Sequence, residues 1–306
     1  MRFAIMGVGG VGGSLGAALL RAGHDVVFVA REGSARALAD RGLEVRHELQ
    51  PFRARSVDVA EDPAGRPPAD AVLLCMKRYD LKEAIRGNRE WLASCGCVIT
   101  LQNGLDAPAV AARLLPPGKV VGGTVQVVAK LTAPAVVLRE GDTLMINLAE
   151  PVGGVSRRTR RFAEIFSKAG VTGQAHRDMR VMLWLKFLMV ACSSSINAAT
   201  GRGFDALAGN PAMHWLLEIA MQEALGVARA LDVPLPGNIE TETRATLKNV
   251  FAFGGKASLL TDLERGNRLE IEWLSGAIHR MGEETGVPTP LHTAIYRELL
   301  PLANGA

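Results

Sequence analysis

Aromatic residues are scarce in this chain of 306 residues, at 5% of the total, and no block of lysine and arginine is interleaved with them. The formal net charge is only +4. Proteins that bind nucleic acids need a dense basic surface, often with aromatic side chains on which bases stack. We therefore expect no nucleic-acid partner, and the mild positive balance suits small anionic molecules better.

Cysteine is also sparse, with four residues in the chain. Cys95 and Cys97 are separated by one residue, which fits neither a redox motif nor a zinc pair. Cys75 and Cys192 lie in apolar runs and are expected to be buried thiols. The six histidines are scattered, so no metal site is expected. The absence of a disulfide framework is typical of a reducing compartment, and we expect a cytoplasmic protein.

Long hydrophobic runs are missing as well. No uncharged apolar stretch reaches the roughly 18 residues of a membrane span, and glycines interrupt the apolar residues after Arg2, which argues against a signal peptide. We therefore expect no membrane partner. With 48% hydrophobic and 22% charged residues, the composition is that of an ordinary soluble globular protein, long enough for two domains or one large one.

What the chain does contain is a glycine-rich turn near its start. The turn at residues 7–12 follows an apolar run at 2–6 and precedes a helical pattern, after which a second apolar run occupies 26–30. This G-x-G-x-x-G turn in a strand–turn–helix–strand setting is typical of a dinucleotide site, where the helix start binds the pyrophosphate. The alternative is a glycine-rich turn with no ligand. The residues expected to bind the cofactor are Gly7, Gly9, Gly10, Val11 and Gly12.

The end of the second strand indicates which cofactor binds. An NAD site usually has an acidic residue there for the ribose 2′-OH, whereas this strand ends at Ala30 and is followed by Arg31. A guanidinium in place of a carboxylate favours a 2′-phosphate, and therefore NADP (as NADPH). The adjacent Glu32 weakens this inference, and a solvated arginine at a strand end is the alternative.

The first half of the chain alternates strands and helices, which predicts an α/β fold with a Rossmann-type doubly wound sheet covered on both faces. The expected strands are 2–6, 25–30, 43–47, 55–59, 70–76 and 97–101, and the expected helices are 11–22, 33–42, 79–93 and 106–115. Shorter strands follow up to residue 150, with a turn at 140–142 that predicts an antiparallel edge. A helix at 156–169 and a strand at 171–175 complete an NADP-binding domain over residues 1–175.

After residue 175 the strand signal disappears, and residues 176–306 are predicted to form an all-helical substrate and catalytic domain. The expected helices are 178–198, 210–231, 238–250, 269–285 and 289–300. Ligands of doubly wound sheets lie beyond the carboxyl ends of the strands. We therefore expect the substrate cleft between the two domains. The oligomeric state is open; the Met- and Leu-rich helices could support a homodimer.

Two polar residues follow predicted strands of the first domain. Lys77 comes directly after the strand at 70–76, where it can reach a cofactor phosphate or ribose, or simply be an exposed loop lysine. Asn103 follows the strand at 97–101 and can both donate and accept hydrogen bonds, to a substrate carbonyl or the nicotinamide ribose. Asn-Gly is also a common turn dipeptide.

Lys186 is the unusual charge of the second domain, because it interrupts an otherwise apolar helix. A lysine there must meet an anion, face a cleft, or extend its ammonium to water. At helical spacing its face also carries a polar stripe, which resembles the wall of a polar pocket. A lysine that pairs with a carboxylate for structural reasons is the alternative. The residues near this face are Val190, Ser193, Ser194 and Asn197.

These residues, together with a C-terminal pattern that runs from Ser258 through Asp262 and Glu270 to Pro290, resemble the ketopantoate reductase family (2-dehydropantoate 2-reductases) over nearly the whole chain. By its position alone, Glu270 is a charge at a helix start. The resemblance implies a Rossmann domain followed by a helical domain. It also implies NADPH-dependent reduction of a small anionic 2-oxo acid, ketopantoate, to pantoate in pantothenate biosynthesis.

The resemblance implies roles for individual residues. Arg31 and Lys77 would bind the 2′-phosphate region of NADP. Lys186 would be the general acid, and Asn103 would hydrogen-bond near it. Ser258 and Glu270 would hold the two ends of the substrate, and Glu270 would keep the lysine charged.

The chain departs from the family at two substrate positions. Family enzymes that act on ketopantoate commonly carry asparagine four and eight residues after the catalytic lysine, where this chain has Val190 and Ser194. Ser194 can still hydrogen-bond to substrate, but Val190 cannot. A paralogue that reduces another branched 2-oxo acid is therefore an alternative. Two further alternatives are a β-hydroxyacid or opine-type dehydrogenase and a non-catalytic NADP-binding sensor.

Overall fold

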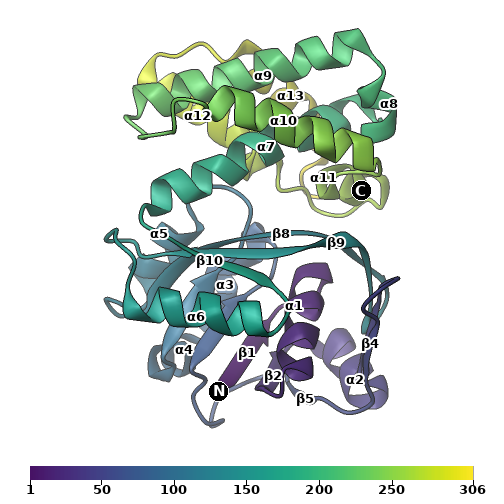
Figure 1. Cartoon of the computed structure of the whole chain (residues 1–306), viewed down its shortest axis with the longest axis vertical. Helices are drawn as coiled ribbons and strands as arrows, with labels where there is room; N and C mark the ends of the chain where they lie inside the picture. Colours follow the sequence, from purple (N-terminus) through teal and green to yellow (C-terminus); the bar gives the residue numbers. More distant parts are fainter. Residues whose placement is uncertain (306) are drawn as a thin grey trace. The chain divides into compact units, whose positions relative to one another are not determined.

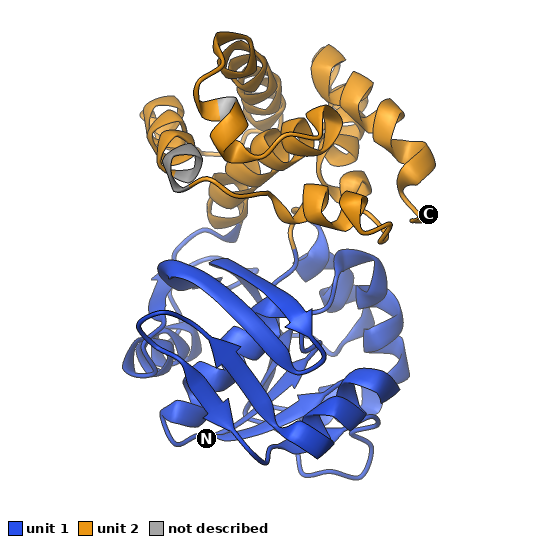
Figure 2. Ribbon diagram, turned by 90° about the vertical axis from the view of Figure 1, so that its right-hand side faces the viewer, with its two compact units in different colours: residues 1–102, 106–179 blue, residues 103–105, 180–306 orange. Residues whose placement is uncertain are grey.

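The computed structural model describes the backbone of residues 1–305 and the side chains of all of these except residues 207 and 250–253. The chain forms two compact units, of which the first comprises residues 1–102 and 106–179. The second unit comprises residues 103–105 and the chain from residue 180 onward (Figure 2). The short segment 103–105 thus belongs with the second unit, although its neighbours in sequence belong to the first.

The first unit is built on a large mixed sheet with helices on its faces (Figure 1). Its strands are β1 (Arg2–Met6), β2 (Asp25–Val29), β3 (Leu43–Arg46), β4 (Phe52–Ala54), β5 (Asp58–Ala60), β6 (Ala71–Leu74), β7 (Cys97–Thr100), β8 (Val120–Ala133), β9 (Val136–Ala149) and β10 (Thr172–His176). Its helices are α1 (Gly10–Arg21), α2 (Glu32–Arg41), the 3-10 turn η1 (Arg78–Asp80), α3 (Leu81–Gly87), α4 (Arg89–Ser94), α5 (Ala107–Leu114) and α6 (Arg157–Lys168).

The parallel part of the sheet has the strand order β5-β2-β1-β6-β7-β8. Numbered along the chain, this is the order 3-2-1-4-5-6 of a doubly wound dinucleotide-binding fold, so the Rossmann-type prediction is confirmed. The strand order reverses between β1 and β6. The turns that follow these two strands therefore flank the crevice where such folds bind ligands.

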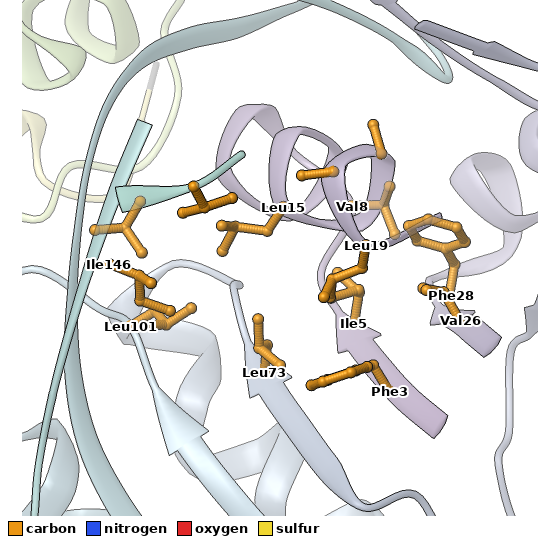
Figure 3. Packing of buried hydrophobic residues seen from close by; sticks show 14 of the residues in the cluster. Phe3, Ile5, Val8, Leu15, Leu19, Val26, Phe28, Leu73, Leu101 and Ile146 are labelled. Atoms are coloured by element: carbon orange, nitrogen blue, oxygen red, sulfur yellow. The ribbon is translucent and has the colours of Figure 1, made fainter. Parts of the chain in front are cut away.

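Both faces of this sheet are apolar because both are covered. Along β1, Phe3 and Ile5 belong to one buried cluster, while Ala4 and Met6 belong to the cluster on the opposite face. Figure 3 shows the first cluster, in which side chains from α1 lie over those of the strands. This packing fixes the start of α1, and with it the glycine turn, against the carboxyl end of β1.

The predicted turn at residues 140–142 is wrong. β9 runs unbroken from Val136 to Ala149, and the register against β8 shifts between Val127 and Val128, so the glycine there (Gly141, φ +66°) forms a bulge. The chain reverses instead just before β9, where Ala135 has a φ of +65°. The β8–β9 pair is also not an edge of the sheet, because β9 pairs with β3 and β10 as well.

The second unit is all-helical over its described residues, as predicted. Its helices are α7 (Met179–Thr200), α8 (Phe204–Ala208), α9 (Pro211–Ala230), α10 (Ile239–Phe253), α11 (Ser258–Glu264), the 3-10 turn η2 (Ile271–Trp273), α12 (Ser275–Thr285), α13 (Pro290–Leu299) and the 3-10 turn η3 (Leu300–Leu302). The predicted helix at 269–285 is wrong at its start. Glu270 precedes the short turn η2, and α12 begins only at Ser275.

Helix α7 is the central apolar helix of the second unit. By length and composition alone it is the one described helix that would suffice to cross a membrane, but 72% of the residues in its apolar window are buried inside the structure. Leu188, Ala191 and Cys192 are fully buried in the helical core. The core helix of a soluble protein passes the same test, so its hydropathy is weak evidence for a membrane span.

Candidate active site

The glycine turn lies at the point where the strand order reverses, between the ends of β1 and β6. Gly7 has a φ of +94°, and a Cβ there would lie 2.6 Å from the backbone nitrogen of Met76. A Cβ on Gly12 would lie 2.1 Å from the carbonyl oxygen of Gly7. These two glycines are therefore required by the fold itself, because the turn is packed against the backbone that follows β6.

Gly9 differs from the other glycines of the turn. A Cβ on Gly9 would meet no protein atom within 4 Å, whereas one on Gly10 would lie 2.4 Å from the carbonyl oxygen of Ala129 in β8. Packing within the protein thus explains Gly10 but not Gly9. Open space at Gly9 is what a pyrophosphate approaching the backbone requires.

The N-terminus of α1 has the features of an anion-binding site. Its N-cap is Gly9, no side chain accepts hydrogen bonds from its first turn, and that turn contains no acidic residue. The N–H groups of the first turn and the positive end of the helix dipole together favour a phosphate at this point. The residues present therefore fit the dinucleotide that the sequence predicts.

Arg31 and the segment after β6 come together beside this turn. Arg31 is the N-cap residue of α2, and its side chain is 80% exposed and forms an ion pair with Asp80 of η1. Lys77 is the N-cap residue of η1, and its carbonyl accepts a hydrogen bond of 3.1 Å from the N–H of Asp80. Sequence reasoning missed Asp80, because nothing in its position indicates a partner from α2.

In the second unit, Lys186 and Glu270 interact electrostatically. Lys186 lies about a third of the way along α7. Burial among apolar residues lowers its pKa to about 8, and the negative charge of Glu270 partly offsets this effect. The Glu270 side chain is only 4% exposed. An ammonium whose pKa is lowered by burial to about 8, beside a buried carboxylate, is typical of a catalytic acid.

Two residues of the polar stripe predicted next to Lys186 form hydrogen bonds to the protein backbone. The hydroxyl of Ser193 donates to the carbonyl of Met189 (2.7 Å), and Oδ1 of Asn197 accepts from the N–H of Ala257 (3.0 Å). Ser194 is 5% exposed and Val190 is half-buried. Ser194 and Val190 thus remain the candidates for substrate contact on this face.

Asn197 has a role that the sequence did not indicate. Its bond to Ala257 holds the N-cap residue of α11, and Ser258, which the sequence predicts to bind substrate, is the exposed first residue of that helix. Asn197 precedes Ser258 by 61 positions in the sequence. No local pattern therefore predicted its hydrogen bond to the start of α11.

Asn103 lies in the short segment 103–105, which belongs to the second unit. The following residue, Gly104, has a φ of +96°, and a Cβ there would lie 3.1 Å from the carbonyl oxygen of Trp273 in η2. The turn that carries Asn103 is therefore packed against the turn that follows Glu270. Among residues 1–305, no group of three His, Cys, Asp or Glu side chains could hold a metal ion.

Family models assign the chain to a class of oxidoreductases with this fold. The model described as "Ketopantoate reductase PanE/ApbA" matches residues 3–151, and the one described as "Ketopantoate reductase PanE/ApbA C terminal" matches residues 178–302. The chain belongs to the ketopantoate reductase PanE/ApbA family, as its sequence motifs predicted.

Two curated relatives span the whole chain. A 2-dehydropantoate 2-reductase of Mesorhizobium japonicum is 28% identical, with 99% of this chain and 98% of the relative aligned. A 2-dehydropantoate 2-reductase of Archaeoglobus fulgidus is 29% identical, with 99% and 97% aligned. These relatives support the family assignment at modest identity.

Solved structures agree on the architecture. A PanE/ApbA family ketopantoate reductase from Ralstonia eutropha superimposes with a TM-score of 0.88 at 28% identity, covering 99% of this chain and 98% of that one. A D-mandelate dehydrogenase has the same fold, with a TM-score of 0.90 at 18% identity, covering 99% of this chain and 98% of that one. One fold thus occurs in proteins named for different 2-hydroxy acids, so the fold alone does not identify the substrate.

Proposed function

We propose that this protein is a ketopantoate reductase that uses NADPH to reduce 2-dehydropantoate to pantoate in pantothenate biosynthesis. The observation that carries the proposal is the Lys186–Glu270 pair, in which burial lowers the pKa of the Lys186 ammonium to about 8. The family assignment and the names of the curated relatives support the substrate. The glycine turn, the uncapped start of α1 and Arg31 support the cofactor.

Each of the candidate site residues would have a distinct role in this reaction. When bound, NADPH supplies the hydride that reaches the 2-oxo carbon. The Lys186 ammonium would hydrogen-bond to the carbonyl oxygen, stabilise the negative charge that develops there and transfer its proton to form the hydroxyl. Glu270 would keep Lys186 protonated. Ser258 and Asn103 would orient the substrate by hydrogen bonds.

A second candidate function keeps this chemistry and changes the substrate. Val190 lies one helical turn from Lys186 and offers no hydrogen bond, so it would present an apolar surface to a substrate bound at Lys186. An apolar wall favours a 2-oxo acid with a branched hydrocarbon side chain over one with a hydroxyl at that position. A non-catalytic NADP sensor is less consistent with Lys186, because a sensor has no need of an ammonium with a lowered pKa.

The substrate is tested by following NADPH oxidation with ketopantoate and with a series of branched 2-oxo acids that lack the hydroxyl. If ketopantoate is the substrate, its kcat/KM exceeds those of the others, and Val190→Asn leaves it unchanged or raises it. If a hydroxyl-free acid is preferred, Val190→Asn should shift the preference toward ketopantoate by about tenfold, the effect of one hydrogen bond in such a pocket. No turnover of any 2-oxo acid would contradict both candidates.

The cofactor preference is tested at Arg31. We expect Arg31→Ala to weaken NADPH binding about tenfold and leave NADH binding nearly unchanged, because the 2′-phosphate is the only group of the cofactor that we expect the guanidinium to contact. The effect should shrink at high ionic strength, since this side chain is exposed. Arg36→Ala, at another exposed arginine of α2, is the matched control. Equal losses for the two cofactors would remove the 2′-phosphate assignment.

A further inference from the structure

Gln102 is a buried amide that the proposed reaction does not use. It is the second residue after β7, and it is 5% exposed. Its Nε2 donates to two backbone carbonyls of the neighbouring strand end, those of Leu74 (2.8 Å) and Met76 (3.1 Å). Both N–H groups of the amide are thus directed at the backbone on either side of Cys75.

These bonds extend the sheet where its own ladder stops. The last paired residues of β6 and β7 are Leu74 and Thr100, and beyond them the chain after β6 turns toward the cofactor crevice. On the other side, the N–H of Cys75 donates to the carbonyl of Met6 in β1 (2.7 Å). The segment after β6 is therefore held between the end of β1 and the Gln102 side chain.

The bond to Met76 also determines the orientation of the next residue. The carbonyl of Met76 and the N–H of Lys77 lie in one planar peptide unit, so fixing the carbonyl fixes the backbone from which Lys77 extends. Lys77 begins η1, and η1 supplies Asp80, the partner of Arg31. The Gln102 side chain, just after β7, thus holds the segment that carries Lys77 and the partner of Arg31.

The chemistry of the amide supports this role over mere space filling. Oε1 of Gln102 is buried and has no hydrogen-bond partner among the described residues. Leaving a buried carbonyl oxygen unpaired is unfavourable, and an apolar side chain of the same size would avoid it. Only the NH₂ group can face two carbonyl oxygens, which settles the orientation of the amide. The two bonds of Nε2 are therefore what the amide contributes.

We propose that Gln102 is a positioning residue for the 2′-phosphate end of the NADP site, acting through the Met76–Lys77 peptide. This inference rests on the proposed function, because it requires that Lys77 and Arg31 meet the 2′-phosphate. It predicts that Gln102 influences the choice between NADPH and NADH without contacting either cofactor.

The test compares wild type with Gln102→Met, which keeps the length of the side chain and removes both donors. The dissociation constants of NADPH, NADH and adenosine 2′,5′-bisphosphate are measured by calorimetry. We expect NADPH and the bisphosphate to bind about tenfold more weakly in the variant, with NADH changed by less than about threefold. Gln174→Met, at an exposed glutamine of β10, is the control and should change nothing. Equal weakening of NADPH and NADH, or no weakening, would overturn the proposal.

A double-variant cycle separates this proposal from the cofactor assignment. If Gln102 acts through Lys77, Gln102→Met should have no further effect on the NADPH-to-NADH ratio once Lys77→Ala is present. Additive effects would refute action through Lys77. If Lys77→Ala and Arg31→Ala both leave the ratio at its wild-type value, the 2′-phosphate assignment itself fails. Should Gln102→Met not fold, Gln102→Glu serves in its place: it retains one donor when protonated, so a wild-type ratio at every pH would overturn the proposal.

Discussion

Replacing Lys186 by alanine is expected to lower kcat for 2-oxo acid reduction by about 10³-fold, with a much smaller change in the affinity for NADPH. The variant loses both the proton donor and the positive charge at the oxygen that becomes an alkoxide. Each effect alone is worth about 10²-fold or more, and the two overlap because a single ammonium supplies both. Steady-state kinetics on the purified variant give the number. Lys248→Ala, at an exposed lysine of α10, is the matched control and should keep wild-type rates.

The pH dependence gives an independent readout of the same group. Because the protonated amine is the acid and its pKa is about 8, kcat/KM for reduction should be constant below this pH and fall about tenfold per unit above it. Glu270 raises the pKa of Lys186, so Glu270→Gln should move this fall to lower pH. Lys186→Arg keeps the positive charge, but the guanidinium stays protonated at these pH values. This variant should therefore have a low rate that does not fall near pH 8. A wild-type rate in Lys186→Ala would refute the mechanism.

The sequence was sufficient to predict the elements with strong, local signals. The glycine turn between two apolar runs, the alternation of strands and helices, and a lysine inside an apolar helix each depend on near neighbours in the chain. The family motifs then connected these elements to one reaction. The structure agrees on both fold types, and on Lys186 beside Glu270.

The features that the sequence missed depend on partners distant in the chain. Gly141 carries the composition of a turn, and only pairing with β8 makes it a bulge. Glu270 was expected to start a helix, but Leu274 has φ and ψ of −113° and −104°, which delay α12 to the next residue. Asn197 and Gln102 bond to backbone groups of other elements. Polar side chains that bond to distant backbone give no periodic signal, because their partners are set by tertiary packing.

Replacing Gly9 by alanine is expected to weaken NADPH binding by about 10²-fold while leaving the unfolding temperature nearly unchanged. The backbone of Gly9 (φ −90°, ψ −158°) suits any residue, and an added Cβ meets no protein atom within 4 Å. The folded protein should therefore accept the methyl group, to within about 1 kcal/mol of stability. The pyrophosphate should not, because the methyl group occupies the space through which it reaches the N–H groups of α1.

Two other glycines make this prediction specific. Gly87→Ala at the end of α3 also adds a methyl group into open space and should change neither stability nor cofactor binding appreciably, since no ligand is expected there. Gly12→Ala should behave in the opposite way and destabilise the protein, because its Cβ would lie 2.1 Å from the carbonyl oxygen of Gly7. Thermal unfolding of the three variants shows which glycine the fold requires, and NADPH titration shows which glycine the bound cofactor requires. If Gly9→Ala binds NADPH like wild type, the phosphate does not approach the backbone at this turn, and the glycine motif serves packing alone.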